Sequence, residues 1–214
     1  MKDVGGNGRT VLFVSHNMAA VKSLCTKGIV LEHGKVVFKG ESNAAVDYYL
    51  EKQKISTTNL EDRTDREGNQ KIKFTNIEIE NSKGNIVEQI FVGEATKFKF
   101  TFKENEKIDW SKFIMSVIFY DLNDNIMCSF PSDEMGQVFK QTNNNQIVLN
   151  IPFMGLRASV YSVSIYSFVA DTNKDSALDI INNASIFEVL TEDFYNSGKL
   201  LRSQNCAFLK SNYE

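Results

Sequence analysis

The two histidines of the chain are the side chains best suited to proton transfer or to holding a ligand by hydrogen bonds. They are His16 and His33, and both lie in the first 50 residues. His16 directly follows the apolar run VLFVS (residues 11–15), so its imidazole would stand at the end of a buried strand. Such a histidine is either a ligand-contacting group or an ordinary hydrogen-bonded loop residue.

No other group of residues has the spacing of a catalytic or metal site. The chain after residue 70 contains no histidine, and neither a Ser-His-Asp set nor a placeable carboxylate pair is evident. Gly5, Gly6 and Gly8 are not followed by the Lys-Ser/Thr of a phosphate-binding loop, so they predict a turn. The 3 cysteines are odd in number and widely spaced, which favours free thiols in a reducing compartment.

The charge and hydropathy of the chain restrict its partners. The net charge of −3 lacks the basic excess of a general nucleic-acid binder. No apolar run approaches the ~20 residues that cross a bilayer, and the first residues lack the apolar stretch of a signal peptide. We therefore expect no nucleic-acid partner and a cytoplasmic location.

The elements around His16 predict an α/β fragment over residues 1–50. The run at 11–15 suits a parallel strand buried on both faces, and a helix through residues 18–27 would follow. Gly28 should end that helix, and GIVLEHGKVVFKG (residues 28–40) predicts two short strands around a turn at 32–34. Ser42 is a candidate N-cap for a last helix over 43–52.

Residues 51–70 are predicted to be a linker. Ile55 and Leu60 are its only large apolar residues, and charges of both signs with Thr and Asn fill the rest. Such a segment buries too little apolar surface to order itself, which places a domain boundary here.

Residues 71–214 change to a period of two. In ATKFKFTFK (95–103) Phe98, Phe100 and Phe102 alternate with Lys and Thr, and similar alternation recurs over 112–122, 146–153 and 159–169. Polar turn sequences separate these runs. Many short alternating strands predict an Ig-like antiparallel β-sandwich, so the whole chain is mainly β, with the α/β fragment in front.

The segment GRTVLFVSHNMAAVKSLCTKGIVLEHGKVVFKG resembles the end of an ABC ATPase nucleotide-binding domain. The ordered context carries the resemblance: a buried strand, Ser15-His16-Asn17, a helix, and a strand pair with Gly34 and Gly40. Met18, Cys25 and the later YYL narrow it to the ATP-binding subunits of polysaccharide exporters of the O-antigen and teichoic-acid type. The resemblance spans residues 9–50 strongly and 71–214 loosely, where IPFMGLRASVYSVSIYSF is similar to the sandwich of that family.

The resemblance implies a role for His16 and for the whole protein. His16 would be the switch histidine beside the γ-phosphate of ATP, and the intact protein would be an ATPase that uses ATP and Mg²⁺. The phosphate loop, the Mg²⁺-binding acidic residue and the signature loop would lie upstream of residue 1. We therefore expect no ATP hydrolysis and no cofactor for this chain alone.

The resemblance also implies that the sandwich binds the exported glycan. Sugar sites combine aromatic faces with polar side chains, and the outward-facing positions of two predicted strands supply both. The candidates are Ser116, Tyr120, Ser162, Ser164 and Tyr166, with Trp110 as a possible stacking platform. The alternatives are a plain solvated or dimer-packed face for the Ser/Tyr set, and a core or edge plug for Trp110.

The expected partners follow from the same resemblance. They are the transmembrane permease of the exporter at the inner face of the plasma membrane, the surface polysaccharide, and a second copy in a homodimer. An alternative function remains open, in which the sandwich only dimerises or docks, without sugar specificity.

Overall fold

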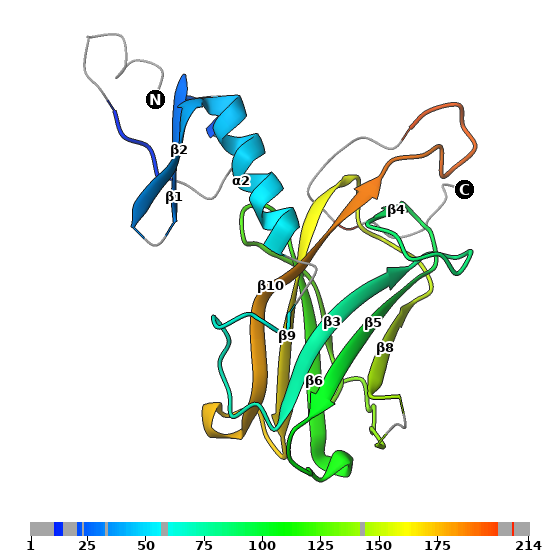
Figure 1. The fold of residues 1–214 in the computed structure, drawn as a ribbon. Helices are drawn as coiled ribbons and strands as arrows, with labels where there is room; N and C mark the ends of the chain where they lie inside the picture. Colours follow the sequence, from blue (N-terminus) through cyan, green and yellow to red (C-terminus); the bar gives the residue numbers. More distant parts are fainter. Residues whose placement is uncertain are drawn as a thin grey trace. The chain divides into compact units, whose positions relative to one another are not determined.

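The computed structural model of the chain describes residues 11–14, 21–22, 24–32, 34–56, 60–141, 144–200 and 207 (Figure 1). His16, the predicted switch histidine, lies outside the described residues, as does His33. The chain divides into two compact units, one formed by residues 1–55 with 122–124 and the other by 56–121 with 125–214.

The first unit contains a hairpin and a helix. Strands β1 (Lys27–Glu32) and β2 (Lys35–Glu41) pair antiparallel, and helix α2 (Ser42–Ser56) follows directly. A Cβ added to Gly28 would lie 2.4 Å from that of Ala45, so the hairpin and the helix touch closely there. Phe38 stacks on Tyr48 at a centroid distance of 4.8 Å. The predicted strand pair and last helix are confirmed.

The strand predicted over residues 11–15 is not formed at 11–14, where the backbone is irregular and Leu12 and Val14 are exposed. A parallel strand needs neighbouring strands, and the described residues supply none for it. Ile29, Leu31 and Val36 of the hairpin are exposed as well. Each of these apolar side chains is left largely uncovered by the described residues.

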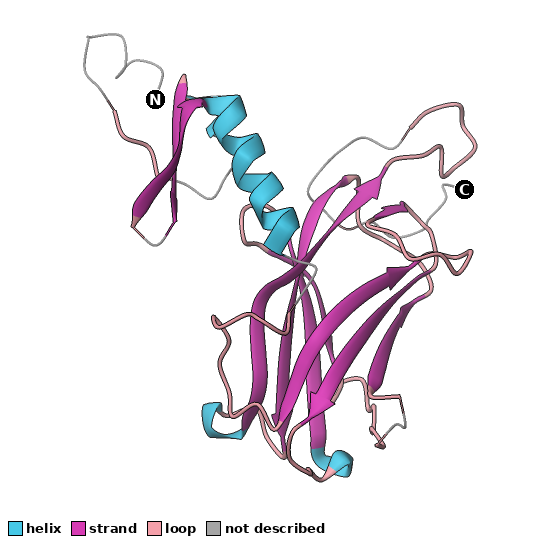
Figure 2. Cartoon of the chain, in the orientation of Figure 1, coloured by secondary structure: helices cyan, strands magenta, loops and turns pink. Residues whose placement is uncertain are grey.

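The second unit is a β-sandwich, which confirms the predicted fold class (Figures 1 and 2). A five-stranded sheet has the order β4-β10-β9-β6-β7, and a three-stranded sheet has the order β3-β5-β8. The strands are β3 (Ile72–Glu80), β4 (Gln89–Phe91), β5 (Thr96–Glu104), β6 (Phe113–Tyr120), β7 (Ile126–Pro131), β8 (Gln146–Ile151), β9 (Ser159–Val169) and β10 (Ala177–Leu190). Two 3₁₀ turns, Trp110–Lys112 and Lys174–Ser176, precede β6 and β10.

The alternation of apolar residues builds the core between the two sheets. Phe98 and Phe102 of β5 are buried, while Lys97 and Lys103 at alternate positions are exposed. Phe98 meets Phe119 of the opposite sheet at a centroid distance of 4.9 Å. The period of two therefore identified the inward faces correctly.

One strand pair departs from the antiparallel pattern. β4 runs parallel to the end of β10, with Gln89 opposite Glu188 and Phe91 opposite Leu190. β3 and β5 belong to the other sheet, so the chain between them crosses to β10 and returns. A three-residue strand has almost no periodicity, which is why the sequence did not reveal this crossing.

The structure also differs from the linker expected over residues 51–70. Helix α2 continues to Ser56, and residues 60–71 lie along the sandwich. We call residues 60–71 the edge arm. The Glu67 and Ile180 backbones exchange hydrogen bonds of 3.1 and 2.9 Å, so the arm covers an edge of β10. Leu60 is fully buried, and this one apolar residue anchors a segment that is otherwise polar.

Candidate functional site

Strands β6 and β9 lie side by side and bring most of the predicted glycan-binding candidates together. Ser116 is paired with Tyr166, and Tyr120 with Ser162. The alternate residues Val117 and Val163 are buried in the core, so the Ser/Tyr set lies on the opposite face of the sheet. We call this outward surface the β6–β9 face.

Two tyrosines and an asparagine form a hydrogen-bonded row on this face. The Tyr166 hydroxyl donates to Asn182 Oδ1 at 2.8 Å, and the Tyr120 and Tyr166 hydroxyl oxygens are 3.3 Å apart. Because the Tyr166 proton points at Asn182, Tyr120 is the donor in the second bond. The row therefore runs from β6 across β9 to β10, and its aromatic rings are half-buried.

Ser164 has a structural role. Its side chain is buried, and its hydroxyl accepts a 3.0 Å hydrogen bond from the backbone N–H of Asn183. Ser116 and Ser162 are half-buried on the same face. Among the serines predicted for the site, these two can meet a ligand, and Ser164 instead supports the neighbouring strand.

Trp110 does not offer a stacking platform. It is only 8% exposed, and its ring lies 5.2 Å from that of Phe102 and 5.0 Å from that of Phe113. Its indole N–H donates to Glu104 at 3.3 Å. Trp110 is therefore a core residue, which was the alternative interpretation. Its 3₁₀ turn directly precedes β6, and the ring fills that end of the core.

Asn182 and Arg63 also contribute to this face, and neither was predicted from the sequence. Asn182 lies in an irregular stretch of β10, where the register on β9 shifts between Ile181 and Ser185. Arg63, in the edge arm, donates to the backbone carbonyls of Asn182 and Asn183 at 2.9 and 2.8 Å. The one available signal was the pair of asparagines in LDIINNASIF, which interrupts an otherwise apolar strand.

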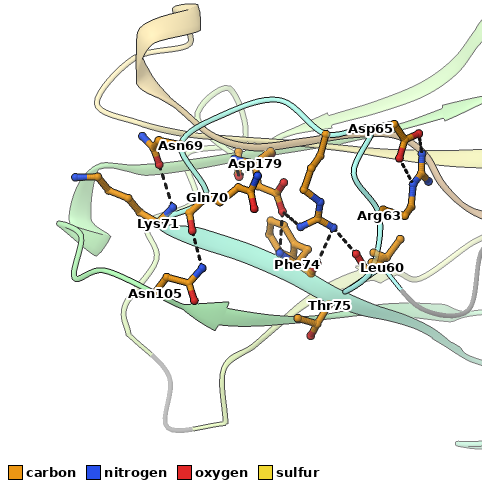
Figure 3. A network of polar contacts seen from close by, with 12 residues as sticks. Leu60, Arg63, Asp65, Asn69, Gln70, Lys71, Phe74, Thr75, Asn105 and Asp179 are labelled. Carbon is orange, nitrogen blue, oxygen red and sulfur yellow. Dashed lines mark hydrogen bonds and ion pairs between the residues drawn. The ribbon is translucent and has the colours of Figure 1, made fainter.

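A buried ion pair fixes the rest of the edge arm (Figure 3). Arg66 Nη1 lies 3.1 Å from Asp179 Oδ2, and the two side chains are 1% and 0% exposed. Asp179 Oδ2 also accepts the Phe74 N–H at 2.8 Å, and Arg66 Nη2 donates to the carbonyl oxygens of Leu60 and Phe74. The pair thereby joins the arm, β3 of one sheet and β10 of the other.

Burial dominates the electrostatics of this pair. It raises the pKa of Asp179 to about 6, although the Phe74 N–H and the Arg66 guanidinium both act to lower it. Burial likewise lowers the pKa of Arg66. Asp179 Oδ1 and Arg66 Nε have no hydrogen-bond partner within the described structure. The pair specifies where the arm docks, at a cost in desolvation.

The described residues hold no group of three or more His, Cys, Asp or Glu side chains that could bind a metal ion. None of the helices in this same part of the chain is long and apolar enough to cross a membrane. What the β6–β9 face offers is aromatic rings, hydroxyls and an amide, which are groups that bind polar ligands.

Sequence and structure comparisons define the class of the sandwich. Residues 63–200 match the model of the Wzt C-terminal domain family, and the chain belongs to that family. A curated relative is the teichoic acids export ATP-binding protein TagH of Bacillus anthracis, which is 36% identical over 66 residues. That match covers 30% of this chain and 12% of TagH, so the chain spans a small part of that relative.

The fold agrees with a solved member of the family. The crystal structure of the C-terminal domain of Wzt aligns with a TM-score of 0.54 over 71% of this chain and 89% of that one. The two sequences are 14% identical, so this likeness concerns the fold alone. The predicted relationship to the ATP-binding subunits of polysaccharide exporters is confirmed at the level of the family.

Proposed function

We propose that this chain is part of the ATP-binding subunit of an ABC exporter for a cell-surface polysaccharide, and that its sandwich recognises the glycan through the β6–β9 face. The observation that carries the glycan proposal is the row of Tyr120, Tyr166 and Asn182 on that face, in a domain of the Wzt C-terminal family. The relative TagH, named as a teichoic acids export protein, supports the transport assignment.

The chemistry of the row suits a sugar. Tyrosine rings offer apolar faces to the C–H groups of a pyranose, while their hydroxyls exchange hydrogen bonds with sugar hydroxyls. Ser116 and Ser162 flank the rings at the paired positions of the two strands. The two tyrosines and two serines stand at regularly paired positions of β6 and β9, so these four side chains are preorganised, and binding costs little ordering.

The first unit supports the ATPase part of the proposal. Its exposed residues Ile29, Leu31 and Val36 are what a hairpin taken from a larger α/β domain would present. In the intact protein we assign His16 the switch role beside the γ-phosphate, with ATP and Mg²⁺ bound by residues outside this chain. The permease would then hold the subunit at the cytoplasmic face of the membrane.

The glycan proposal is tested by calorimetric titration of the full chain with the surface polysaccharide of its own organism. Tyr166→Ala and Tyr120→Ala should each weaken binding by roughly tenfold or more, because both remove a ring and a hydroxyl from the row. Tyr195→Ala is the matched control, since Tyr195 is an exposed tyrosine outside the face. Equal loss in the control, or no binding by the folded wild type, would refute glycan recognition here.

The ATPase proposal has a separate test in the intact protein. His16→Ala should abolish ATP turnover there, while ATP binding should remain, because the histidine acts on the γ-phosphate rather than on the nucleotide base. Turnover at the wild-type rate would refute the assignment of His16.

Dimerisation or docking is the second candidate function. Ile126 of β7 and Val148 of β8 are exposed on strands that end the two sheets, where a partner could pair. A folded chain that binds no polymer but sediments as a dimer, and becomes a monomer on Ile126→Lys, would favour this function.

A further inference from the structure

We infer that Arg63 is a positioning residue for the proposed glycan site: it fixes the backbone of β10 so that Asn182 completes the row with Tyr166 and Tyr120. This inference rests on the proposed function of the β6–β9 face. It adds two residues to the site and connects the site to the edge arm.

The irregularity in β10 is what makes such fixing necessary. Between Ile181 and Ser185 the chain takes four steps along β10, whereas β9 takes two, from Ile165 to Val163. The two additional residues form a bulge, and Asn183 adopts a left-handed conformation with φ of 49°. Backbone groups in a bulge leave the ladder, so side chains must hold them in place.

Arg63 and Ser164 hold the bulge from two sides. The Arg63 guanidinium donates to the carbonyls of Asn182 and Asn183, and Asp65 holds it through Oδ1 at 2.8 Å and Oδ2 at 2.5 Å. The Arg63 side chain is 13% exposed, so water competes little for these bonds. On the other side, Ser164 accepts the Asn183 N–H. Three hydrogen bonds thus fix the backbone of Asn182 and Asn183.

Asn182 carries this placement into the site. Its Oδ1 is held by the Tyr166 hydroxyl, which orients the amide. Its Nδ2 makes no hydrogen bond among the described residues, and the side chain is exposed. The amide therefore presents two N–H donors beside the tyrosine rings, and these suit an acceptor oxygen of a bound sugar, such as a hydroxyl, ring or acyl oxygen.

The position of Arg63 in the edge arm couples the proposed glycan site to the segment that precedes the sandwich. Leu60, where the edge arm begins, follows the end of helix α2 at Ser56 after three residues. The arm is thus the segment through which the sandwich is joined to the ATP-binding part in the proposed function. If the arm fixes Asn182, a bound glycan must in return strengthen the docking of the arm, because such coupling is reciprocal.

The test is a double-mutant cycle on the full chain, with binding of its organism's surface polysaccharide measured by calorimetry. Asn182→Ala should weaken binding roughly 3- to 10-fold, the effect of one lost neutral hydrogen bond. Arg63→Ala should weaken binding by a similar factor. The double variant should bind as tightly as the single variant that has the lower affinity, because Arg63 acts through Asn182.

Lys103→Ala is the matched control. Lys103 pairs with Glu61 and so also contacts the edge arm, but it does not touch the bulge, and its loss should leave binding unchanged. Asp65→Asn serves if Arg63→Ala does not fold. It weakens only the hold on the guanidinium, and it should give a smaller loss that vanishes in the Asn182→Ala background.

The outcomes separate this inference from the proposed function. If Tyr166→Ala loses binding while Arg63→Ala binds as the wild type does, the site stands and the positioning role is wrong. Additive losses from Arg63→Ala and Asn182→Ala would also overturn it, because they would show independent effects. No binding by the wild type would reject the glycan site and the inference together.

Discussion

The buried pair of Arg66 and Asp179 allows a prediction with a defined magnitude. Arg66→Met keeps the apolar stem but removes the guanidinium, which lies 3.1 Å from Asp179 Oδ2 and also donates to the carbonyls of Leu60 and Phe74. A carboxylate that is 0% exposed then keeps only the Phe74 N–H. Breaking such a pair on one side costs about 3–5 kcal/mol of unfolding free energy.

The cost should depend on pH in a definite direction. The folded pKa of Asp179 is raised, from 3.8 to about 6, so the folded state holds this proton more tightly than the unfolded chain. The stabilisation from this tighter proton binding is complete below the pKa of Asp179 in the unfolded chain. It is lost as the pH rises through the pKa of Asp179 in the folded state. Without Arg66 the folded pKa rises further, so the loss continues to higher pH. The variant should therefore be penalised more at about pH 8 than at about pH 5.

Urea unfolding at both pH values measures this difference. Trp110, the only tryptophan, lies in the core and reports unfolding by its fluorescence. Lys71→Met is the control, because its ion pair with Glu106 is exposed on both sides and should contribute less than about 1 kcal/mol. A loss below about 1 kcal/mol for Arg66→Met, or an equal loss at both pH values, would refute the reasoning about the pair.

Three further changes probe other parts of the sandwich. Gly68→Ala should lower stability by about 2 kcal/mol or more, because φ is +105° and the new Cβ would lie 2.7 Å from the Leu178 carbonyl. Gly84 is also at positive φ but in open space, so Gly84→Ala should cost less stability in thermal unfolding. Equal losses for the two variants would refute the predicted clash. Tyr161→Phe removes the 2.7 Å hydrogen bond to the Arg157 carbonyl and should cost about 1 kcal/mol in urea unfolding, whereas an unchanged midpoint would contradict it. Burial raises the pKa of the Cys128 thiol, so iodoacetamide should label it more slowly in the folded than in the unfolded chain, and equal rates would be the contrary result.

The sandwich was predictable because its strands bury one face only. The alternation through Phe98, Phe100 and Phe102 follows directly from that, and it named the core correctly. Tyr120 and Tyr166 were placed on the outer face for the same reason, and their meeting needed only that β6 and β9 be neighbours. Periodicity thus gave the direction of side chains within β5, β6, β8 and β9.

What the sequence did not reveal depends on contacts between distant segments. Trp110 is a core residue because Phe102 and Phe113 surround it, and no local pattern shows that. The edge arm appears as a polar linker, since its order comes from Leu60, Arg66 and backbone bonds to β10. Asn182 joins the proposed site through a bulge, and a bulge interrupts the alternation on which the sequence-based prediction relies. The role of His16 remains a prediction.

The edge arm also determines where the chain can be truncated without damage to the sandwich. A protein begun at residue 71 would keep β3 to β10, which are all the strands of the sandwich. It would expose the β10 backbone at Ala177, Leu178 and Ile180, and it would lack Arg66, the ion-pair partner of Asp179. Bare strand edges pair with one another, so this shortened protein should aggregate. Fusion proteins that carry this sandwich should therefore have their junction before Leu60.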